Sequence, residues 1–226
     1  MRQWFAALML LSAGSVSAEE NVMLVLDASG SMWGQIDGKA KIEIAREAVD
    51  QLAVNWKPEN RLGLVAYGHR RKGDCGDIET LIPVGAADPK AVIAAVEAIT
   101  PKGKTPLTAA VKQAAEQLRY TEDAATVILI SDGLETCDAD PCTVATSLAE
   151  SGVAFRTHVI GFDLKKKEQE ALRCLAENTG GVFIAAPIVL GFEGLDALYY
   201  WANGAAVLVV CSLHKPESAA SQAIAA

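Results

Sequence analysis

The chain has 226 residues, of which 51% are apolar and 21% charged. It is long and apolar enough to form one domain with a sizeable core, and it does not have the composition of a disordered chain. Lysine and arginine total 20 against 28 acidic residues, for a net charge of −8. This balance argues against non-specific nucleic-acid binding, which needs a basic surface.

The first 18 residues have the three parts of a secretory signal peptide. Arg2 is the basic start, Trp4–Leu11 is the apolar segment, and Val16-Ser17-Ala18 is a small-residue cleavage site. The apolar segment is too short to span a bilayer comfortably. We therefore expect residues 1–18 to be cleaved and the mature protein to be periplasmic or secreted.

Export would place the cysteines in an oxidising compartment, where four of the five would form two disulfides. The five are Cys75, Cys137, Cys142, Cys174 and Cys211. The first four allow three connectivities, and Cys211 is expected to be the odd one out. A zinc site is a weaker alternative because the close pair, Cys137 and Cys142, lacks the Cys-x-x-Cys spacing and has no histidine nearby.

Strands and helices are predicted to alternate along the chain. Apolar runs predict strands at Asn21–Asp27, Arg61–Gly68, Asp77–Val84, Ala125–Ser131, Val153–Phe162 and Val182–Ala186. Apolar stripes and capping residues predict helices over 39–56, 88–99, 106–119, 140–150 and 166–177. The short link between the second and third strands predicts a hairpin, and hence one antiparallel edge strand. The alternation predicts an α/β fold with a doubly wound, mostly parallel six-stranded sheet.

The segment after residue 186 is the least regular part of the sequence. We expect a helix over 192–201 that covers the sheet, followed by a poorly defined tail. Residues 197–213 carry no charge and are marginally long for a membrane helix, so a membrane tether is the less favoured alternative. The expected organisation is a signal peptide over 1–18, one domain over 19–186, and the terminal helix and tail over 187–226.

Oxygen-bearing side chains follow the predicted strands in three segments. Asp27, Ser29 and Ser31 alternate along nearly extended chain, so their side chains point the same way. Thr105 stands just before a helix, and Asp132 stands at a strand end. Right-handed crossovers bring such loops to one edge of a parallel sheet, where α/β folds bind ligands. Hydroxyl and carboxylate oxygens suit a hard cation such as Mg²⁺.

This pattern resembles the metal-ion-dependent adhesion site (MIDAS) of von Willebrand factor type A (vWA) domains, and the resemblance extends over about 21–186. It implies a Rossmann-like fold and Mg²⁺ as the cofactor, with Mn²⁺ or Ca²⁺ as alternatives. Three hydroxyls would touch the metal, and two carboxylates would hold it through water or orient the hydroxyls. The implied site residues are Asp27, Ser29, Ser31, Thr105 and Asp132. The implied function is metal-dependent binding of an aspartate or glutamate from a partner protein, without catalysis.

Each of these residues also has a purely structural explanation, such as capping a turn or a helix. A vWA scaffold that binds no metal is therefore one alternative. A serine hydrolase is another, because Ser29, Asp132 and His158 follow the chain order of α/β-hydrolases. Asp27 and Ser31 occupy the glycine positions of the nucleophile elbow, however, which disfavours this alternative.

A nucleotide-binding loop is a further alternative at Gly103-Lys104-Thr105. It is disfavoured because the motif requires glycine at position 98, which is Ala98, and a preceding strand instead of a helix. Near the site, Trp33 is interpreted equally well as a contact residue or as packing of the turn. The basic run at 69–72 is expected to be a solvated hairpin tip, and that at 165–167 a solvated helix start.

Overall fold

The computed structural model describes residues 20–133, 135–186, 197–202 and 205–210. Its centre is a six-stranded sheet in the order β5-β4-β1-β6-β7-β8, in which β5 alone runs antiparallel to its neighbour. The strands are β1 (Asn21–Asp27), β4 (Arg61–Tyr67), β5 (Ile78–Ala86), β6 (Ala125–Ser131), β7 (Phe155–Phe162) and β8 (Phe183–Ala186). The predicted sheet, with its antiparallel edge strand, is confirmed.

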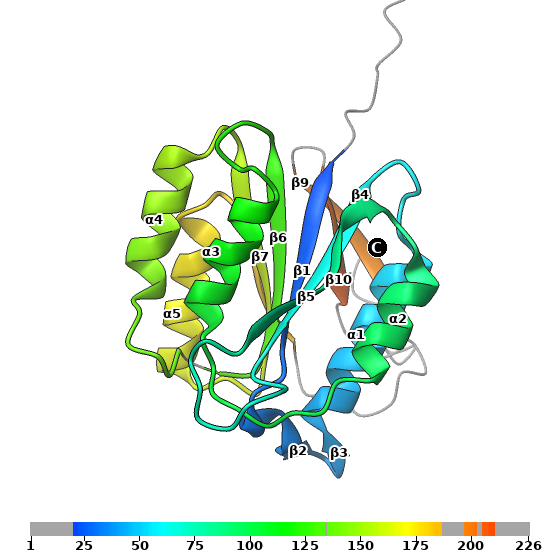
Figure 1. The fold of residues 1–226 in the computed structure, drawn as a ribbon, viewed down its shortest axis with the longest axis vertical. Coiled ribbons are helices and arrows are strands. Elements are labelled where there is room, and N and C mark those ends of the chain that lie inside the picture. Colours follow the sequence, from blue (N-terminus) through cyan, green and yellow to red (C-terminus); the bar gives the residue numbers. More distant parts are fainter. Residues whose placement is uncertain (1–19, 134, 187–196, 203–204, 211–226) are drawn as a thin grey trace, which may run out of the picture.

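Helices cover both faces of this sheet (Figure 1). On one side lie α1 (Lys41–Val54) and α2 (Pro89–Glu97), and on the other lie α3 (Leu107–Gln117), α4 (Pro141–Ser151) and α5 (Lys166–Glu177). Asp88 and Asp140 cap α2 and α4 by accepting backbone N–H groups of the first turn. The five predicted helices before residue 186 are confirmed.

The central strand β1 shows why the layers form. Its inner residues are fully buried, and they alternate between two hydrophobic clusters. Leu24 and Leu26 pack on the side of α1, whereas Met23 and Val25 pack on the side of α3. An apolar run in a strand buried on both faces therefore fixes where β1 ends and places Asp27 at the carboxyl edge of the sheet.

Two short strands follow β1. A 3₁₀ helix (Gly30–Trp33) leads into a small hairpin of β2 (Gln35–Ile36) and β3 (Lys39–Ala40). This hairpin takes up residues 39–40, so α1 begins at Lys41, two residues later than predicted.

The helix predicted over 192–201 is wrong in the part that the structure describes. Ala197–Ala202 is a strand, β9, and it pairs antiparallel with β10 (Ala205–Val210). The sequences Leu-Tyr-Tyr-Trp and Val-Leu-Val-Val favour strands because aromatic and β-branched residues fit a pleated surface. The intervening sequence is Asn-Gly, the dipeptide most typical of two-residue hairpins. Residues 192–196 lie outside the described residues.

Two disulfides connect the four cysteines that the structure describes. Cys75 joins Cys137, with Cα atoms 5.8 Å apart, and Cys142 joins Cys174, with Cα atoms 5.4 Å apart. The first links the β4–β5 loop to the loop after β6, and the second links α4 to α5. The two predicted disulfides are thus present, in one of the three connectivities that the sequence allowed.

Two predictions fall outside the described residues: the signal peptide over 1–18 and the unpaired Cys211. Among the residues that are described, no helix has the length and apolar character needed to cross a membrane.

Candidate functional site

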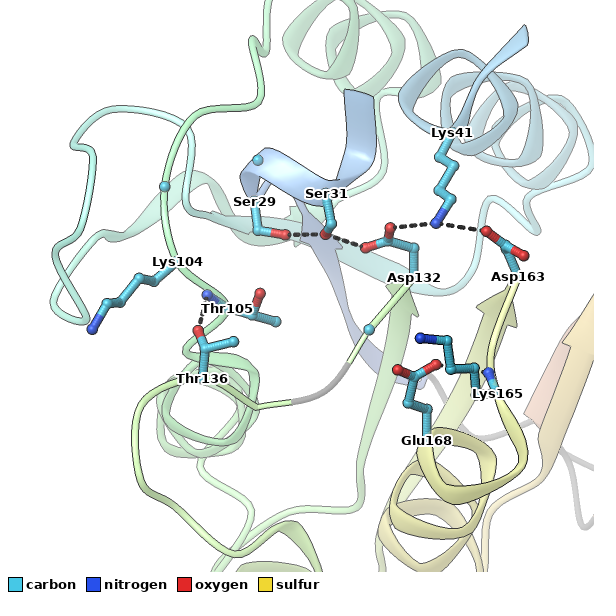
Figure 2. A pocket seen from close by; sticks show the side chains of 13 residues that line it. Ser29, Ser31, Lys41, Lys104, Thr105, Asp132, Thr136, Asp163, Lys165 and Glu168 are labelled. Carbon is cyan, nitrogen blue, oxygen red and sulfur yellow. Dashed lines mark hydrogen bonds and ion pairs between the residues drawn. The ribbon is translucent and has the colours of Figure 1, made fainter. Parts of the chain in front are cut away.

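An open pocket of about 700 Å³ lies at the carboxyl edge of the parallel strands. It is bordered by the turn after β1, the loop before α3, and the loops after β6 and β7. Ser29, Ser31, Thr105 and Asp132 all line it (Figure 2). The sheet therefore gathers four of the five predicted site residues from three separate segments, and the fifth lies below them.

A chain of hydrogen bonds connects three of these residues. The Ser29 and Ser31 hydroxyl oxygens are 2.9 Å apart, and the Ser31 hydroxyl donates to Asp132 Oδ1 over 2.7 Å. Ser31 is exposed to solvent, whereas Ser29, Thr105 and Asp132 are nearly buried. Figure 2 shows Thr105 on the side of the pocket that faces Ser29. The result is a small volume bordered by neutral hydroxyls with a carboxylate at one end.

Asp27 lies beneath the pocket and is fully buried. Its Oδ1 accepts the backbone N–H of Ser29 at 2.8 Å, and its Oδ2 accepts the Ser131 hydroxyl at 2.6 Å. The Tyr67 hydroxyl in turn donates to the Ser131 oxygen over 3.3 Å. Asp27 thereby fixes the backbone that presents Ser29.

Burial perturbs the acid–base behaviour of this lower layer. It raises the pKa of the Asp27 carboxyl, and the nearby charge of Asp132 raises it further, while hydrogen bonds from Ser131 and Ser29 counteract part of this rise. Burial and the charge of Asp27 likewise raise the pKa of Tyr67 well above its usual value. A positive charge in the pocket would relieve the repulsion between the two carboxylates.

The Thr105 loop is held close to β1 and β4 by backbone contacts. Gly103 N donates to Gly68 O over 2.6 Å, and Gly30 N donates to Gly103 O over 3.0 Å. Gly68 has a φ of +71°, and a Cβ there would lie 2.5 Å from the Lys104 carbonyl oxygen. Only glycine allows this approach, because a side chain would strain the backbone and displace the loop that carries Thr105.

A second loop, after β6, holds Thr105 from the other side. Thr136 Oγ1 accepts the Thr105 N–H at 2.8 Å, and Glu135 Oε2 accepts the Thr108 N–H at 2.8 Å. The Cys75–Cys137 disulfide anchors this loop at its middle, one residue after Thr136. Sequence analysis missed Glu135 and Thr136, although their place directly behind the Asp132 segment could have suggested them.

Lys41 and Asp163 also border the pocket and were missed. Lys41 Nζ lies 2.9 Å from Asp132 Oδ2 and 2.9 Å from Asp163 Oδ2. Burial alone would lower the pKa of Lys41, but the hydrogen bonds and charges of Asp163 and Asp132 raise it overall. A lysine at the first position of a helix opposes the helix dipole, which was a usable clue. Asp163 follows the end of β7, as Asp132 follows β6.

Trp33 and two groups of basic residues lie close to the pocket. Trp33 holds the turn, because its Nε1 donates to Pro101 O over 2.9 Å; 53% of the residue is exposed, and its role as a contact residue stays a prediction. Arg70 and Arg71 bind the buried Asp77, so the basic run is a hairpin tip held by ion pairs. Lys104 and Lys165 are exposed on the pocket wall.

His158 does not border the pocket. It is buried in the middle of β7 opposite Ile128, four residues before Asp132. Burial, with a smaller contribution from the charge of Arg156, lowers its pKa to about 4. Ser29, Asp132 and His158 therefore do not assemble as the hydrolase alternative requires.

The donor set determines which metal would fit. Within the described ranges, no group of three His, Cys, Asp or Glu side chains converges to hold a metal. The four described cysteines are all in disulfides, so they offer no zinc site. The pocket instead offers hydroxyl and carboxylate oxygens, which fit a hard cation such as Mg²⁺. Only two of the five predicted site residues, Asp27 and Asp132, are carboxylates. The other three carry hydroxyls, so all of the donor atoms are oxygen.

Comparison with known proteins agrees with this architecture. The family model described as von Willebrand factor type A domain matches residues 22–135. Over 190 residues the chain is 28% identical to the uncharacterized protein YwmD of Bacillus subtilis, spanning 80% of this chain and 85% of that one.

Two solved structures share the fold at low sequence identity. The vWF domain of the type V pili tip protein Mfa5 from Porphyromonas gingivalis has a TM-score of 0.59 at 16% identity, over 76% of this chain and 90% of that one. Proximal thread matrix protein 1 of the mussel byssus, with a zinc-occupied MIDAS motif, has a TM-score of 0.57 at 18% identity. That match spans 76% of this chain but 42% of the mussel chain.

The fold is a doubly wound α/β domain with an open pocket at the carboxyl edge of its parallel strands, lined in part by hydroxyl and carboxylate side chains. With the family match over half its length, the chain belongs to the von Willebrand factor type A domain family.

Proposed function

We propose that the protein is a divalent-metal-dependent protein-binding module, acting by binding and not by catalysis. The observation that carries this proposal is the hydrogen-bonded series Ser29, Ser31, Asp132, which ends in the pocket that Thr105 also lines. Helix capping does not explain these hydroxyls, because the Ser29 side chain makes no capping hydrogen bond to the 3₁₀ helix that follows it, and Pro106, not Thr105, is the N-cap of α3.

The pocket residues would hold Mg²⁺ in two ways, directly and from behind the direct ligands. The hydroxyls of Ser29, Ser31 and Thr105 would be direct ligands, and Asp132 and Asp27 would supply negative charge from behind them. Neutral ligands cancel little of the ion's charge, so the bound ion supplies an electrophilic position for an anionic oxygen. A partner's aspartate or glutamate is the protein group that fits this position, and the ion would then be the centre of the interface.

Export of the mature protein is part of the proposal. The signal-like sequence at 1–18 and the two disulfides support a periplasmic or secreted protein. The pili tip protein Mfa5 supports it by analogy of fold alone.

Metal binding can be tested with a pair of matched threonine variants. Thr105→Val removes one pocket hydroxyl while preserving shape, and calorimetric titration with MgCl₂ should show a loss of affinity of about tenfold or more. Thr108→Val is the control, because Thr108 is equally buried, lies three residues away, and does not line the pocket. If Thr105→Val binds Mg²⁺ as the wild type does, the proposed ligand set is wrong.

A metal-independent scaffold is the second candidate, and one observation favours it. The Lys41 ammonium already supplies a positive charge to Asp132. Affinity capture from the native cell envelope in Mg²⁺ and in EDTA separates the two candidates. Capture that is equal in both buffers supports the scaffold, whereas capture that EDTA abolishes supports the metal-dependent module.

A further inference from the structure

Lys41 places a nearly buried positive charge at the edge of the pocket. Its side chain is 11% exposed, and Nζ is 2.9 Å from an oxygen of Asp132, whose side chain is fully buried. The same Nζ is 2.9 Å from Asp163, which is 45% exposed. Figure 2 shows Lys41 between the two carboxylates, on the side of Asp132 opposite Ser31.

The local backbone is shaped around this lysine. Lys41 N donates to Gly34 O over 2.9 Å, and a Cβ on Gly34 would lie 3.2 Å from Lys41 Cε and 3.0 Å from Ser31 O. Asp163 adopts φ +49°, in the left-handed region that aspartate enters more readily than most non-glycine residues. Two carboxylates hold Nζ, and a glycine leaves room for the side chain beside them, so the position of Nζ is specified.

The two oxygens of Asp132 are committed to different partners. Oδ1 accepts the Ser31 hydroxyl and Oδ2 accepts Lys41. The carboxylate is therefore oriented with one oxygen toward the hydroxyls and the other held away from them. Because Lys41 neutralises part of its charge, Asp132 has less negative charge to offer to a cation in the pocket.

We propose that Lys41 is a positioning residue that keeps Asp132 out of direct contact with the metal and lowers the affinity of the pocket for divalent ions. This inference rests on the proposed function. An ammonium and a metal ion compete for the same carboxylate and repel each other, so the ion binds more weakly. The same competition leaves the ion more electrophilic, and a partner carboxylate then adds the negative charge that Lys41 has neutralised.

The test is calorimetric titration of the full chain with MgCl₂, without a partner. Lys41→Met keeps the length of the side chain and removes its charge, and it should bind Mg²⁺ about tenfold more tightly than the wild type. Lys104→Met is the matched control. Lys104 lines the same pocket and is exposed, and in the described part of the chain no ion pair joins it to Asp132, so its removal should change the affinity much less.

Thermal unfolding of the metal-free protein separates this role from a structural one. Lys41→Met should melt at a lower temperature than the wild type, because it leaves the buried Asp132 without its cation. A purely structural role predicts weaker or unchanged Mg²⁺ binding together with that loss. Lower apo stability combined with tighter metal binding is expected only if Lys41 competes with the ion.

Asp163→Asn is a second variant that is expected to fold, because Asp163 is half-exposed. It removes one of the two carboxylates that share Lys41, so Mg²⁺ should bind severalfold more weakly. Equal affinities of Lys41→Met and wild type, or tighter binding by Asp163→Asn, would overturn the inference while leaving the proposed function in place. If neither wild type nor Lys41→Met binds Mg²⁺, the proposed function and the inference fail together.

Discussion

The lower and upper parts of the site are built in different ways. We call Asp27, Ser131 and Tyr67 the floor, and Thr105, Thr136 and Trp33 the rim. The floor residues stand at the ends of β1, β6 and β4, are fully buried and bond to one another. Thr105 and Thr136 stand on two loops that hydrogen-bond to each other, Trp33 ends the 3₁₀ helix and bonds to Pro101, and one disulfide ties the Thr136 loop to the β4–β5 loop. Sheet pairing thus fixes the floor, whereas contacts between loops fix the rim.

This contrast predicts that floor variants lose both stability and metal binding, whereas rim variants lose metal binding or partner binding with a smaller loss of stability. The first prediction concerns Asp27→Ala, which leaves the Ser29 N–H and the Ser131 hydroxyl buried without their acceptor. We expect the free energy of unfolding to fall by about 4 kcal/mol, Mg²⁺ binding to be lost, and the fold to persist. Urea unfolding and calorimetry measure the two effects.

Asp50→Ala is the control for that experiment, because Asp50 lies on α1 away from the pocket. It should change both quantities little. An Asp27→Ala protein that is as stable as the Asp50→Ala protein would show that the floor does not support the fold.

The second prediction uses the two disulfides, one of which anchors the rim. Replacing Cys75 and Cys137 by alanine opens a link with a sequence separation of 62, and should reduce the free energy of unfolding by about 3 kcal/mol. Mg²⁺ affinity should also fall, because the freed loop carries the Thr136 hydroxyl that accepts the Thr105 N–H.

The Cys142–Cys174 pair provides the matched control. It links α4 to α5 with a sequence separation of 32, so its removal should cost slightly less stability by the same entropic argument. Neither of its cysteines lines the pocket, so Mg²⁺ affinity should be unchanged. If both double variants weaken Mg²⁺ binding equally, the rim is not specifically held by the first disulfide.

The same contrast explains what the sequence could predict. Asn21–Asp27 and Ala125–Ser131 were predicted with their observed ends, because a continuous apolar run that stops at a polar residue marks both the strand and its edge. Asp27, Ser29, Ser31 and Asp132 follow directly from those ends. Residues whose role depends on where a neighbouring loop lies leave no such pattern, and Thr136 and Glu135 belong to this group.

The sequence analysis missed the role of Lys41 and the terminal hairpin for different reasons. Lys41 opens a helix whose apolar stripe was recognised, and nothing in the stripe indicates that the first lysine turns toward Asp132. In the segment after residue 186, large apolar residues at helical spacing predict a helix. The aromatic and β-branched composition around Asn203-Gly204 favoured a hairpin instead, and β9 and β10 follow that preference.

The third prediction concerns the free energy of unfolding at low pH, and it separates the effect of His158 from that of Asp27. His158 has its pKa lowered to about 4 by burial, so the folded state keeps it neutral where the unfolded chain would protonate it. Stability is therefore complete above pH 6.5 and is lost as the pH falls from 6.5 toward 4, by about 2 kcal/mol at pH 5. Asp27 acts in the opposite direction, because its raised pKa makes protonation favour the folded state.

Urea unfolding at pH 8 and pH 5 measures this difference in the metal-free protein. His158→Gln removes the titration and retains an acceptor for the Val182 N–H, which now donates to His158 Nδ1. The stability of His158→Gln should stay level or rise slightly as the pH falls from 8 to 5, because protonation of Asp27 is then the main effect. A wild-type protein that is equally stable at both would exclude His158 as the source of acid sensitivity.

The last prediction concerns the outermost rim residue and should have the smallest effect on the fold. Trp33→Ala removes a half-exposed ring that carries one hydrogen bond, so the free energy of unfolding should fall by only about 1 kcal/mol. Mg²⁺ affinity should be unchanged, because the ring does not line the pocket.

Partner capture in Mg²⁺ should nevertheless drop in Trp33→Ala, since an exposed tryptophan beside the proposed metal site is the kind of side chain that contributes most to an interface. Trp33→Phe separates the ring from its anchor, because it keeps an aromatic surface and loses the N–H that holds Pro101 O. If the ring itself binds the partner, Trp33→Phe should retain most of the capture that Trp33→Ala loses. If both variants lose capture equally, the contribution of Trp33 is to hold the Pro101 segment, and the contact surface lies on the Thr105 loop that follows it.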